Sequence, residues 1–188
     1  MLGSYVIATV SQKVLSFLAK FSDKEFYERD VARRLGIAYG SANRSLNELY
    51  STGAIRRRRA GKMYFYSIDI SNAAILEYKK LVNLTLIEPL IEELKKLANR
   101  IILYGSCSQG TDISRSDFDL FIVTNNRAGV SDVINAFTLR RGYEELRIQP
   151  IIKTSIELLQ TGESERAFIE EVERGIVLWE RAASESRV

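Results

Sequence analysis

The chain has 188 residues, of which 46% are hydrophobic and 27% charged, so it has room for one large domain or two small ones. It contains no histidine, which excludes histidine-metal sites and catalytic pairs that need a histidine base. The single cysteine, Cys107, has no partner for an internal disulfide, the N-terminus lacks a signal-peptide pattern, and no run of about 18 apolar residues is present. We therefore expect a cytoplasmic protein without a membrane span.

The net charge of +3 conceals an uneven distribution along the chain. Residues 1–70 contain 12 Lys and Arg against 6 Asp and Glu, a formal charge of +6. The remaining residues contain 15 and 18, a formal charge of −3. A basic first third favours contact with a polyanion by that part of the chain, and a different role for the remainder.

Residues 1–70 show the order helix, helix, glycine turn, helix and hairpin. Apolar residues recur at helical spacing over 10–21, and the stripe predicts a first helix that begins as early as Tyr5. The other expected elements are a helix over 27–35 ended by Gly36, a helix ended by Gly53, and hairpin strands at 55–59 and 63–68.

This order of elements is typical of a winged helix-turn-helix domain, which places its third helix in the major groove of DNA. The third helix leaves polar side chains on the face that its core residues do not use, and the hairpin carries four consecutive arginines. Such side chains contact base edges and phosphates. The segment resembles the winged-helix repressors of the arsenic-sensor and multiple-antibiotic-resistance types, which implies a recognition helix and a wing. The candidate DNA-binding residues are Tyr39, Asn43, Arg44, Asn47, Arg56, Arg57, Arg58, Arg59 and Lys62.

Contact with another protein is the alternative role for this segment, since a small helical domain with a charged hairpin also serves that purpose. Alternation along a strand sends two of the four arginines to each face. A hairpin that contacts only solvent does not require arginines on both of its faces. The pattern therefore favours double-stranded DNA as the partner.

Residues 71–98 are predicted to form a helical connector. Asn72 is placed to cap its start, and Pro89 is expected to interrupt or restart the helix. The stretch is apolar on more than one face, which leaves two roles open: packing against both modules, or a seam with a second copy of the chain. No Gly/Ser-rich linker separates the modules, so we expect a stiff connection.

From Ile101 the pattern changes to strand, turn and strand. An apolar strand runs into Gly105 and Ser106, a turn that is expected to open a short helix and to bind phosphate. Eleven residues beyond Ser106, a second strand carries Asp117 and Asp119. A spacing of two on a strand places both carboxylates on one face, where they are suited to hold divalent metal ions with a nucleoside triphosphate.

Residues 103–123 resemble the DNA polymerase β nucleotidyltransferase superfamily, and especially its small prokaryotic members, the minimal nucleotidyltransferases. The residues that carry the resemblance are Gly105, Ser106, Gly110, Asp117 and Asp119. The resemblance implies that the two aspartates are catalytic and bind Mg²⁺ or Mn²⁺. It implies that the Gly-Ser turn binds the phosphates of ATP or another nucleoside triphosphate. Minimal nucleotidyltransferases often pair with small helical proteins as antitoxins, so such a partner is implied as well.

The family's third carboxylate lies on a later strand, expected here at 146–152 after a helix that starts at about Ser131 and ends at Gly142. Alignment of the strand places that position at or near Gln149, which is neutral. Glu145 has the same strand parity but lies four residues away, roughly 13 Å along an extended chain. Glu144 faces the other way. Neither replaces the missing carboxylate, so the sequence leaves turnover open.

The last segment of the chain is expected to contain one more helix, which runs through Phe168 and Val172 and is stopped by Gly175. A short apolar end follows, in which Trp179 is interpreted as a core residue rather than a base-stacking platform.

The sequence thus predicts an α+β protein with a winged helix-turn-helix domain at 1–70, a helical connector at 71–98, and a nucleotidyltransferase-like domain at 99–188 with a small mixed sheet. The predicted function is Mg²⁺-dependent transfer of a nucleoside monophosphate to an unidentified acceptor by a DNA-binding protein. The alternative is a transcription regulator, antitoxin-like in character, whose second domain is catalytically silent and binds nucleotide or supports a homodimer. Gln149 favours the alternative, and the complete Gly-Ser and Asp-x-Asp set favours the enzyme.

Overall fold

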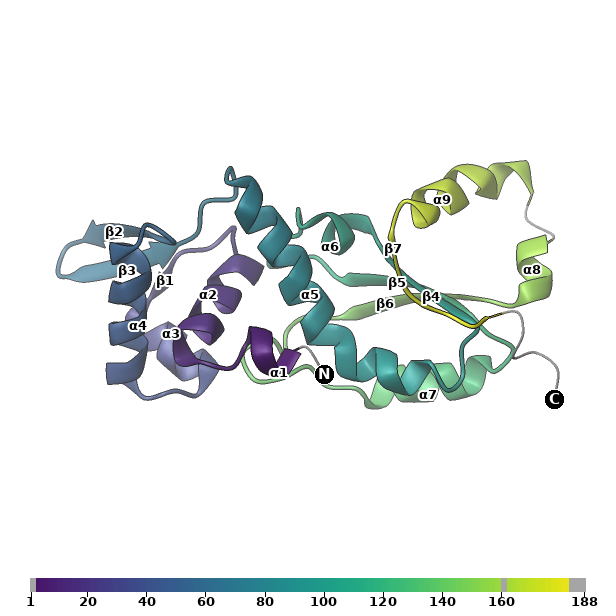
Figure 1. Cartoon of the computed structure of the whole chain (residues 1–188), viewed down its shortest axis with the longest axis horizontal. Helices are drawn as coiled ribbons and strands as arrows, with labels where there is room; N and C mark the ends of the chain where they lie inside the picture. Colours follow the sequence, from purple (N-terminus) through teal and green to yellow (C-terminus); the bar gives the residue numbers. More distant parts are fainter. Residues whose placement is uncertain (1–2, 160–161, 183–188) are drawn as a thin grey trace.

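The computed structural model describes residues 3–159 and 162–182. The N-terminal part comprises α1 (Gly3–Val6), α2 (Val10–Lys20), β1 (Phe26–Tyr27), α3 (Glu28–Leu35), α4 (Tyr39–Ser51), β2 (Arg56–Ala60) and β3 (Met63–Ser67). The long helix α5 (Ala73–Leu94) follows. The C-terminal part comprises β4 (Arg100–Tyr104), α6 (Gly105–Gln109), β5 (Phe118–Val123), α7 (Arg127–Ala136), β6 (Ile148–Lys153), α8 (Ser155–Leu159), α9 (Glu163–Glu173) and β7 (Ile176–Glu180). Figure 1 shows an elongated molecule with these two parts at opposite ends and α5 between them.

The N-terminal part contains the predicted three helices and hairpin, and adds a strand that the sequence did not indicate. β1 pairs with β3 to make a three-stranded antiparallel sheet in the order β1-β3-β2. This order of elements is the basis of the winged-helix assignment, which remains a prediction.

The first helix does not run from Tyr5, as the apolar stripe suggested. Thr9 caps α2: its hydroxyl accepts a hydrogen bond from the Gln12 backbone at 3.2 Å, and the Gln12 side chain accepts one from the Thr9 backbone at 2.9 Å. This reciprocal capping box fixes the start of α2 at Val10 and leaves α1 as a separate turn of helix.

The connector α5 is one continuous helix, so the expectation that Pro89 breaks it was wrong. A proline inside a helix leaves the carbonyl four residues earlier without its N–H donor, which here is the carbonyl of Thr85. The guanidinium of Arg140 donates to that oxygen at 2.8 Å and so replaces the missing bond. Asn72 caps the start of α5, as expected, by accepting from the Ala74 backbone at 2.9 Å.

The C-terminal part is built on the predicted small mixed sheet, with strand order β6-β5-β4-β7. β5 and β6 are parallel, and the other pairs are antiparallel. One face, with Leu103 and Leu120, packs against apolar residues of α5 and α7. The other face, with Phe121, is covered by Phe168 and Val172 of α9. The α+β fold class is thereby confirmed.

Several boundaries in this part differ from expectation. α7 ends at Ala136 rather than at Gly142, and β6 starts at Ile148 rather than at Leu146. α7 begins at Arg127 rather than near Ser131, because the Asn126 side chain caps it by accepting from the Gly129 backbone at 3.0 Å. The apolar end after Gly175 is an edge strand, β7, paired with β4. Its Trp179 is partly buried against the main core, which agrees with the interpretation of this residue as core.

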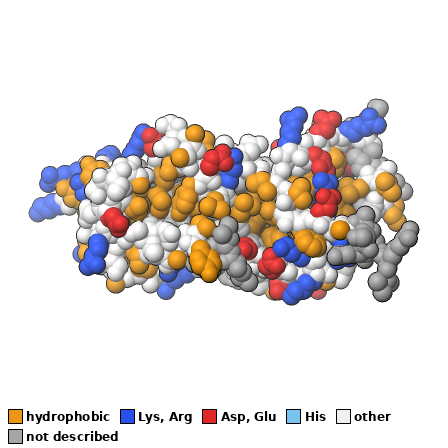
Figure 2. All heavy atoms as spheres, viewed as in Figure 1, with side chains coloured by type: hydrophobic (Ala, Val, Ile, Leu, Met, Phe, Trp, Pro, Cys, Tyr) orange, Lys and Arg blue, Asp and Glu red, His pale blue; other side chains and the backbone are white. Residues whose placement is uncertain are grey.

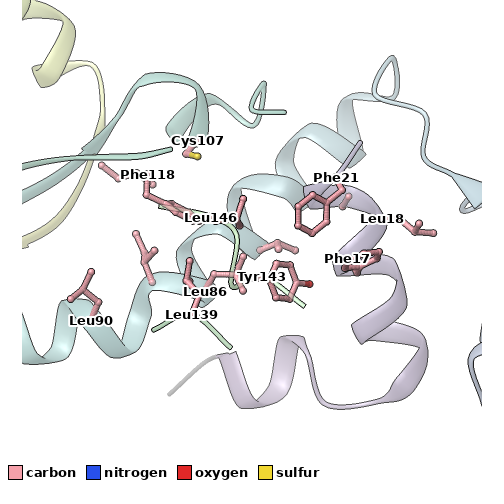
Figure 3. Packing of buried hydrophobic residues seen from close by; sticks show 14 of the residues in the cluster. Phe17, Leu18, Phe21, Leu86, Leu90, Cys107, Phe118, Leu139, Tyr143 and Leu146 are labelled. Carbon is pink, nitrogen blue, oxygen red and sulfur yellow. The ribbon is translucent and has the colours of Figure 1, made fainter. Parts of the chain in front are cut away.

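One hydrophobic core runs from the N-terminal part into the C-terminal part. Tyr143 is 1% exposed, and its ring stacks on Phe21, the residue after α2, with centroids 6.0 Å apart (Figure 3). Phe17 contacts the same ring edge-on at 6.2 Å. The two parts therefore share a packed interior rather than a flexible hinge. None of the described helices combines the length and the apolar character needed to cross a membrane.

Candidate functional site

The Gly-Ser turn and the Asp-x-Asp segment lie in direct contact. β4 ends at Tyr104, which pairs in register with Asp119 of β5. Gly105 then adopts a positive φ of 66° and starts α6. A Cβ atom at Gly105 would lie 2.6 Å from Oδ2 of Asp119. Position 105 therefore requires glycine for two reasons: its left-handed backbone conformation, and the Asp119 carboxylate that occupies the space of a side chain.

Neither aspartate has a cation at ion-pair distance among the described residues, although Lys24, Arg115 and Arg147 line one pocket with Asp117. Asp119 lies on β5, whereas Asp117 lies just before that strand instead of on it. Both are partly buried, and within the described residues neither carboxylate accepts a hydrogen bond or forms an ion pair. Desolvation raises the pKa of Asp119, and the charges of Asp117 and Glu171 raise it further. A bound cation would relieve this repulsion.

Gln149 lies directly beside Asp119. The two residues are register partners on the parallel strands β5 and β6, so their side chains share one face of the sheet. Glu145 instead forms an ion pair with Arg34 of α3 at 2.7 Å, and Glu144 accepts from the Gly142 backbone at 2.7 Å. Glu144 is thus engaged with the backbone, and Glu145 is paired with Arg34 although it lines one pocket with Asp117. Within the described chain no group of three or more Asp, Glu or Cys side chains could hold a metal ion.

A cleft of about 380 Å³ adjoins the Gly-Ser turn and includes residues that sequence reasoning missed. It lies between α6 and α9, and its lining includes Glu171 of α9, Arg174 at the end of that helix, Ser108 and Gln109. Glu171 also contributes to the raised pKa of Tyr104, after desolvation and Asp119. No local pattern marks these α9 residues, because only the packing of that helix on the sheet brings them to the turn.

A buried polar cluster anchors the loop between α6 and Asp117. The fully buried Nζ of Lys20 donates to Oδ2 of Asp112 at 2.8 Å and to Oδ1 of Asn83 at 2.9 Å. Lys79 of α5 donates to the Asp112 carbonyl. Cys107 donates to the Asp117 carbonyl at 3.2 Å, and burial raises the pKa of its thiol to about 12. The loop that presents Asp117 is therefore held by side chains of α2 and α5.

The predicted DNA-binding residues of α4 share one solvent-facing side. Arg44 is exposed and, among the described residues, has no carboxylate partner. Asn47 donates to Asn43 on the same helix and accepts from Arg57 of the hairpin at 3.1 Å. Tyr39 is 48% exposed, but its hydroxyl donates to Glu28 at 2.7 Å. That bond ties the start of α4 to α3.

The four consecutive arginines are not equivalent. Arg56 pairs with Asp69, and Arg58 pairs with Glu25, whose pKa it lowers by hydrogen bonding. Arg57 lies over the rings of Tyr50 and Tyr64, with centroid distances of 3.9 and 4.5 Å.

Arg59 donates only to the Gly61 carbonyl, and Lys62 is exposed; neither has a carboxylate partner in the part of the chain that is described. Figure 2 shows Lys and Arg side chains gathered at the end of the molecule where this hairpin lies. Arg59 and Lys62 are thus the hairpin cations most available to an external anion.

A mixed sheet that sets a Gly-Ser turn against an Asp-x-Asp segment is the arrangement expected of a nucleotidyltransferase. Residues 87–184 match the family model described as Polymerase beta, Nucleotidyltransferase. The match spans more than half of the chain, and the protein belongs to this family. No solved structure matches the chain.

Proposed function

We propose that this protein binds double-stranded DNA and transfers a nucleoside monophosphate from a nucleoside triphosphate, in the presence of Mg²⁺, to an acceptor. The observation that carries the enzymatic part is the contact between Gly105 and Asp119, next to the second unpaired carboxylate of Asp117. Membership of the polymerase β family supports nucleotidyl transfer in general terms.

The residues present fit a divalent cation in part. Asp117 and Asp119 would hold Mg²⁺ or Mn²⁺, because two unpaired carboxylates offer the hard oxygen ligands that these ions prefer. The ion would supply positive charge that offsets the triphosphate. The backbone at Gly105 and the Ser106 hydroxyl would bind phosphate oxygens, as the family resemblance implies. Gln149 offers only a neutral amide oxygen where the family has its third carboxylate.

Transfer of label from ATP labelled at the α-phosphate tests this assignment. The wild-type protein should pass label to an acceptor when Mg²⁺ is present, and the double variant Asp117→Asn/Asp119→Asn should lose about 100-fold or more of that rate. Asp132→Asn is the matched control, since Asp132 is an exposed carboxylate on α7. Equal transfer by wild type and double variant would show that the two aspartates are not the metal ligands.

The register of Gln149 with Asp119 favours a second candidate function. In this version the domain binds nucleotide without transferring it, and the protein acts as a transcription regulator. The two candidates separate cleanly in one experiment. A catalytically silent domain would bind Mg²⁺-ATP but release no pyrophosphate. This result should hold with ATP in large excess over the protein and with DNA and candidate partner proteins present.

The DNA-binding part of the proposal rests on charge and exposure. The formal charge of residues 1–70 is +6, and the exposed side of α4 adjoins a hairpin with two cations that have no carboxylate partner among the described residues. Arginines that displace counterions from phosphates make affinity depend steeply on salt.

Two neighbouring arginines provide a matched test of this surface. Arg59→Ala should weaken binding to duplex DNA and reduce the salt slope by about 0.9, the value for one phosphate contact. Arg58→Ala should have less effect, because Arg58 is already paired with Glu25. A wild-type protein that fails to bind duplex DNA at low salt would end the DNA proposal.

A further inference from the structure

A basic pocket lies where the two parts of the molecule meet, beside the start of α4. It has a volume of about 600 Å³ and is lined by Arg29 and Arg33 of α3, by Tyr39, and by Arg141 from the segment between α7 and β6. The pocket shares no lining residue with the cleft at the Gly-Ser turn. Its three arginines play no part in the functions described above.

Arg141 is held in this pocket by close packing. Its guanidinium lies against the α carbon of Gly36, where a Cβ atom would come within 2.5 Å of Arg141 Cζ. Nη2 of Arg141 donates to the Arg33 carbonyl at 3.2 Å. The next residue, Gly142, has a positive φ of 93°, and a Cβ there would lie 3.2 Å from Leu35. Two glycines thus let the C-terminal part place a guanidinium on the N-terminal part.

The pocket carries positive charge that its own lining does not balance. Among the residues that the structure describes, no carboxylate lines it, and neither Arg29 nor Arg141 forms an ion pair. Arg33 pairs with Asp30, three residues away on the same exposed helix surface, and such a pair contributes little. Guanidinium groups bind phosphate oxygens through paired N–H donors, so converging arginines favour a phosphate group as the ligand.

We propose that this pocket binds a backbone phosphate of the duplex that α4 contacts, so that the nucleotidyltransferase part itself grips DNA through Arg141. The proposal rests on the proposed DNA binding. The pocket lies at the Tyr39 end of α4, and Arg57 of the hairpin packs on Tyr50 near the other end.

These two ends are about 16 Å apart at the helical rise. The pocket and the hairpin thus adjoin opposite ends of the helix that is proposed to contact DNA.

The salt dependence of duplex binding by the full chain tests the proposal. We expect Arg141→Ala and Arg29→Ala each to weaken binding and to reduce the slope of log affinity against log salt by about 0.9. Arg166→Ala is the control with the same change in charge, since Arg166 is exposed on α9 at the other end of the molecule. That variant should keep the wild-type slope.

Three outcomes would overturn the proposal, and each is distinguishable. If the wild type binds duplex and Arg59→Ala reduces the slope while Arg141→Ala and Arg29→Ala do not, the pocket fails and DNA binding stands. If Arg141→Ala keeps the wild-type slope and instead abolishes a melting-temperature gain from metal-free ATP, the pocket holds a free nucleotide phosphate. If the wild type binds no duplex at all, the proposed DNA binding and the pocket fail together.

Discussion

The ability of this site to hold metal ions depends on the side chains of Gln149 and Asp119. Their side chains share one face of the sheet as neighbours on parallel strands, and only one of them carries charge. Gly105 approaches the Asp119 carboxylate closely enough to exclude any side chain at that position. The proposed metal site therefore combines close packing around Asp119 with a neutral side chain at Gln149, where the family resemblance implies a third carboxylate.

Replacing Gln149 with aspartate should restore that ligand. We expect Gln149→Asp to tighten Mn²⁺ or Mg²⁺ binding by about tenfold, one charge interaction of roughly 1.4 kcal/mol, and to raise nucleotidyl transfer. Asn135→Asp adds the same charge at an exposed position of α7, on the other face of the sheet, and serves as the control. Brisk transfer by the wild type with no gain in the acidic variant would mean that another group, such as one from the acceptor, completes the site.

The raised pKa of Asp119 has a consequence for stability. The Asp119 carboxyl binds its proton more tightly in the folded protein than in the unfolded chain. The loss of stability that its ionised form causes is therefore absent when the pH is below the ordinary Asp pKa of 3.8. This loss develops as the pH rises from that value through the elevated pKa of the folded state. Asp119→Asn should therefore raise the melting temperature at neutral pH without metal, and leave it unchanged at about pH 3. A lower melting temperature at neutral pH would contradict the repulsion described here.

Among the secondary-structure elements, periodicity predicted most of the helices and the inner strands but not where several of them end, and it did not predict α8. The ends depend on single hydrogen bonds, such as the Thr9 cap of α2 and the Asn126 cap of α7. The edge strands β1 and β7 were missed because they are defined by partners distant in sequence. The Gly-Ser and Asp-x-Asp segments were found because both lie in one short, locally patterned stretch.

Pro89 also shows why local sequence does not determine where a helix ends. Proline has no backbone N–H, and the donor that replaces it, Arg140, is more than 50 residues away in the sequence. Local sequence predicts a break there, and tertiary structure removes it.

Arg140→Ala should leave the Thr85 carbonyl without its donor and lower the free energy of unfolding by about 1–3 kcal/mol. In a Pro89→Ala background the restored N–H satisfies that carbonyl, so the same substitution should cost about 1 kcal/mol less. Urea denaturation of the four proteins gives this coupling energy. Purely additive effects would show that Arg140 does not support the helix at Pro89.

At the scale of the whole molecule, the two parts are joined by a shared core and by a buried charge network. Tyr143 packs between Phe17 and Phe21, and Lys20 of α2 neutralises Asp112 in the loop that leads to Asp117. The elements nearest the aspartates therefore depend on the N-terminal part for their support.

A fragment of residues 71–188 should accordingly fail to unfold cooperatively, whereas the full chain should show a single transition. Lys20→Met tests the same point by a smaller change. It leaves Asp112 buried without its closest cation, which should lower the free energy of unfolding by about 3–5 kcal/mol. A fragment that melts as sharply and at the same temperature as the full chain would show that the C-terminal part is self-sufficient.

We propose that Asp117, Asp119 and the Gly-Ser turn together hold a metal-bound nucleoside triphosphate. Thermal unfolding with and without Mg²⁺-ATP tests it most directly, because a ligand of the native state must stabilise that state. At about 100 times its Kd the complex should add about 2.7 kcal/mol, a melting-temperature gain of about 5–10 °C for a chain of this size. We expect this gain for the wild type and for Asp132→Asn, and none for Asp117→Asn/Asp119→Asn. An equal gain in the double variant would show that the two aspartates do not hold the metal-bound nucleotide.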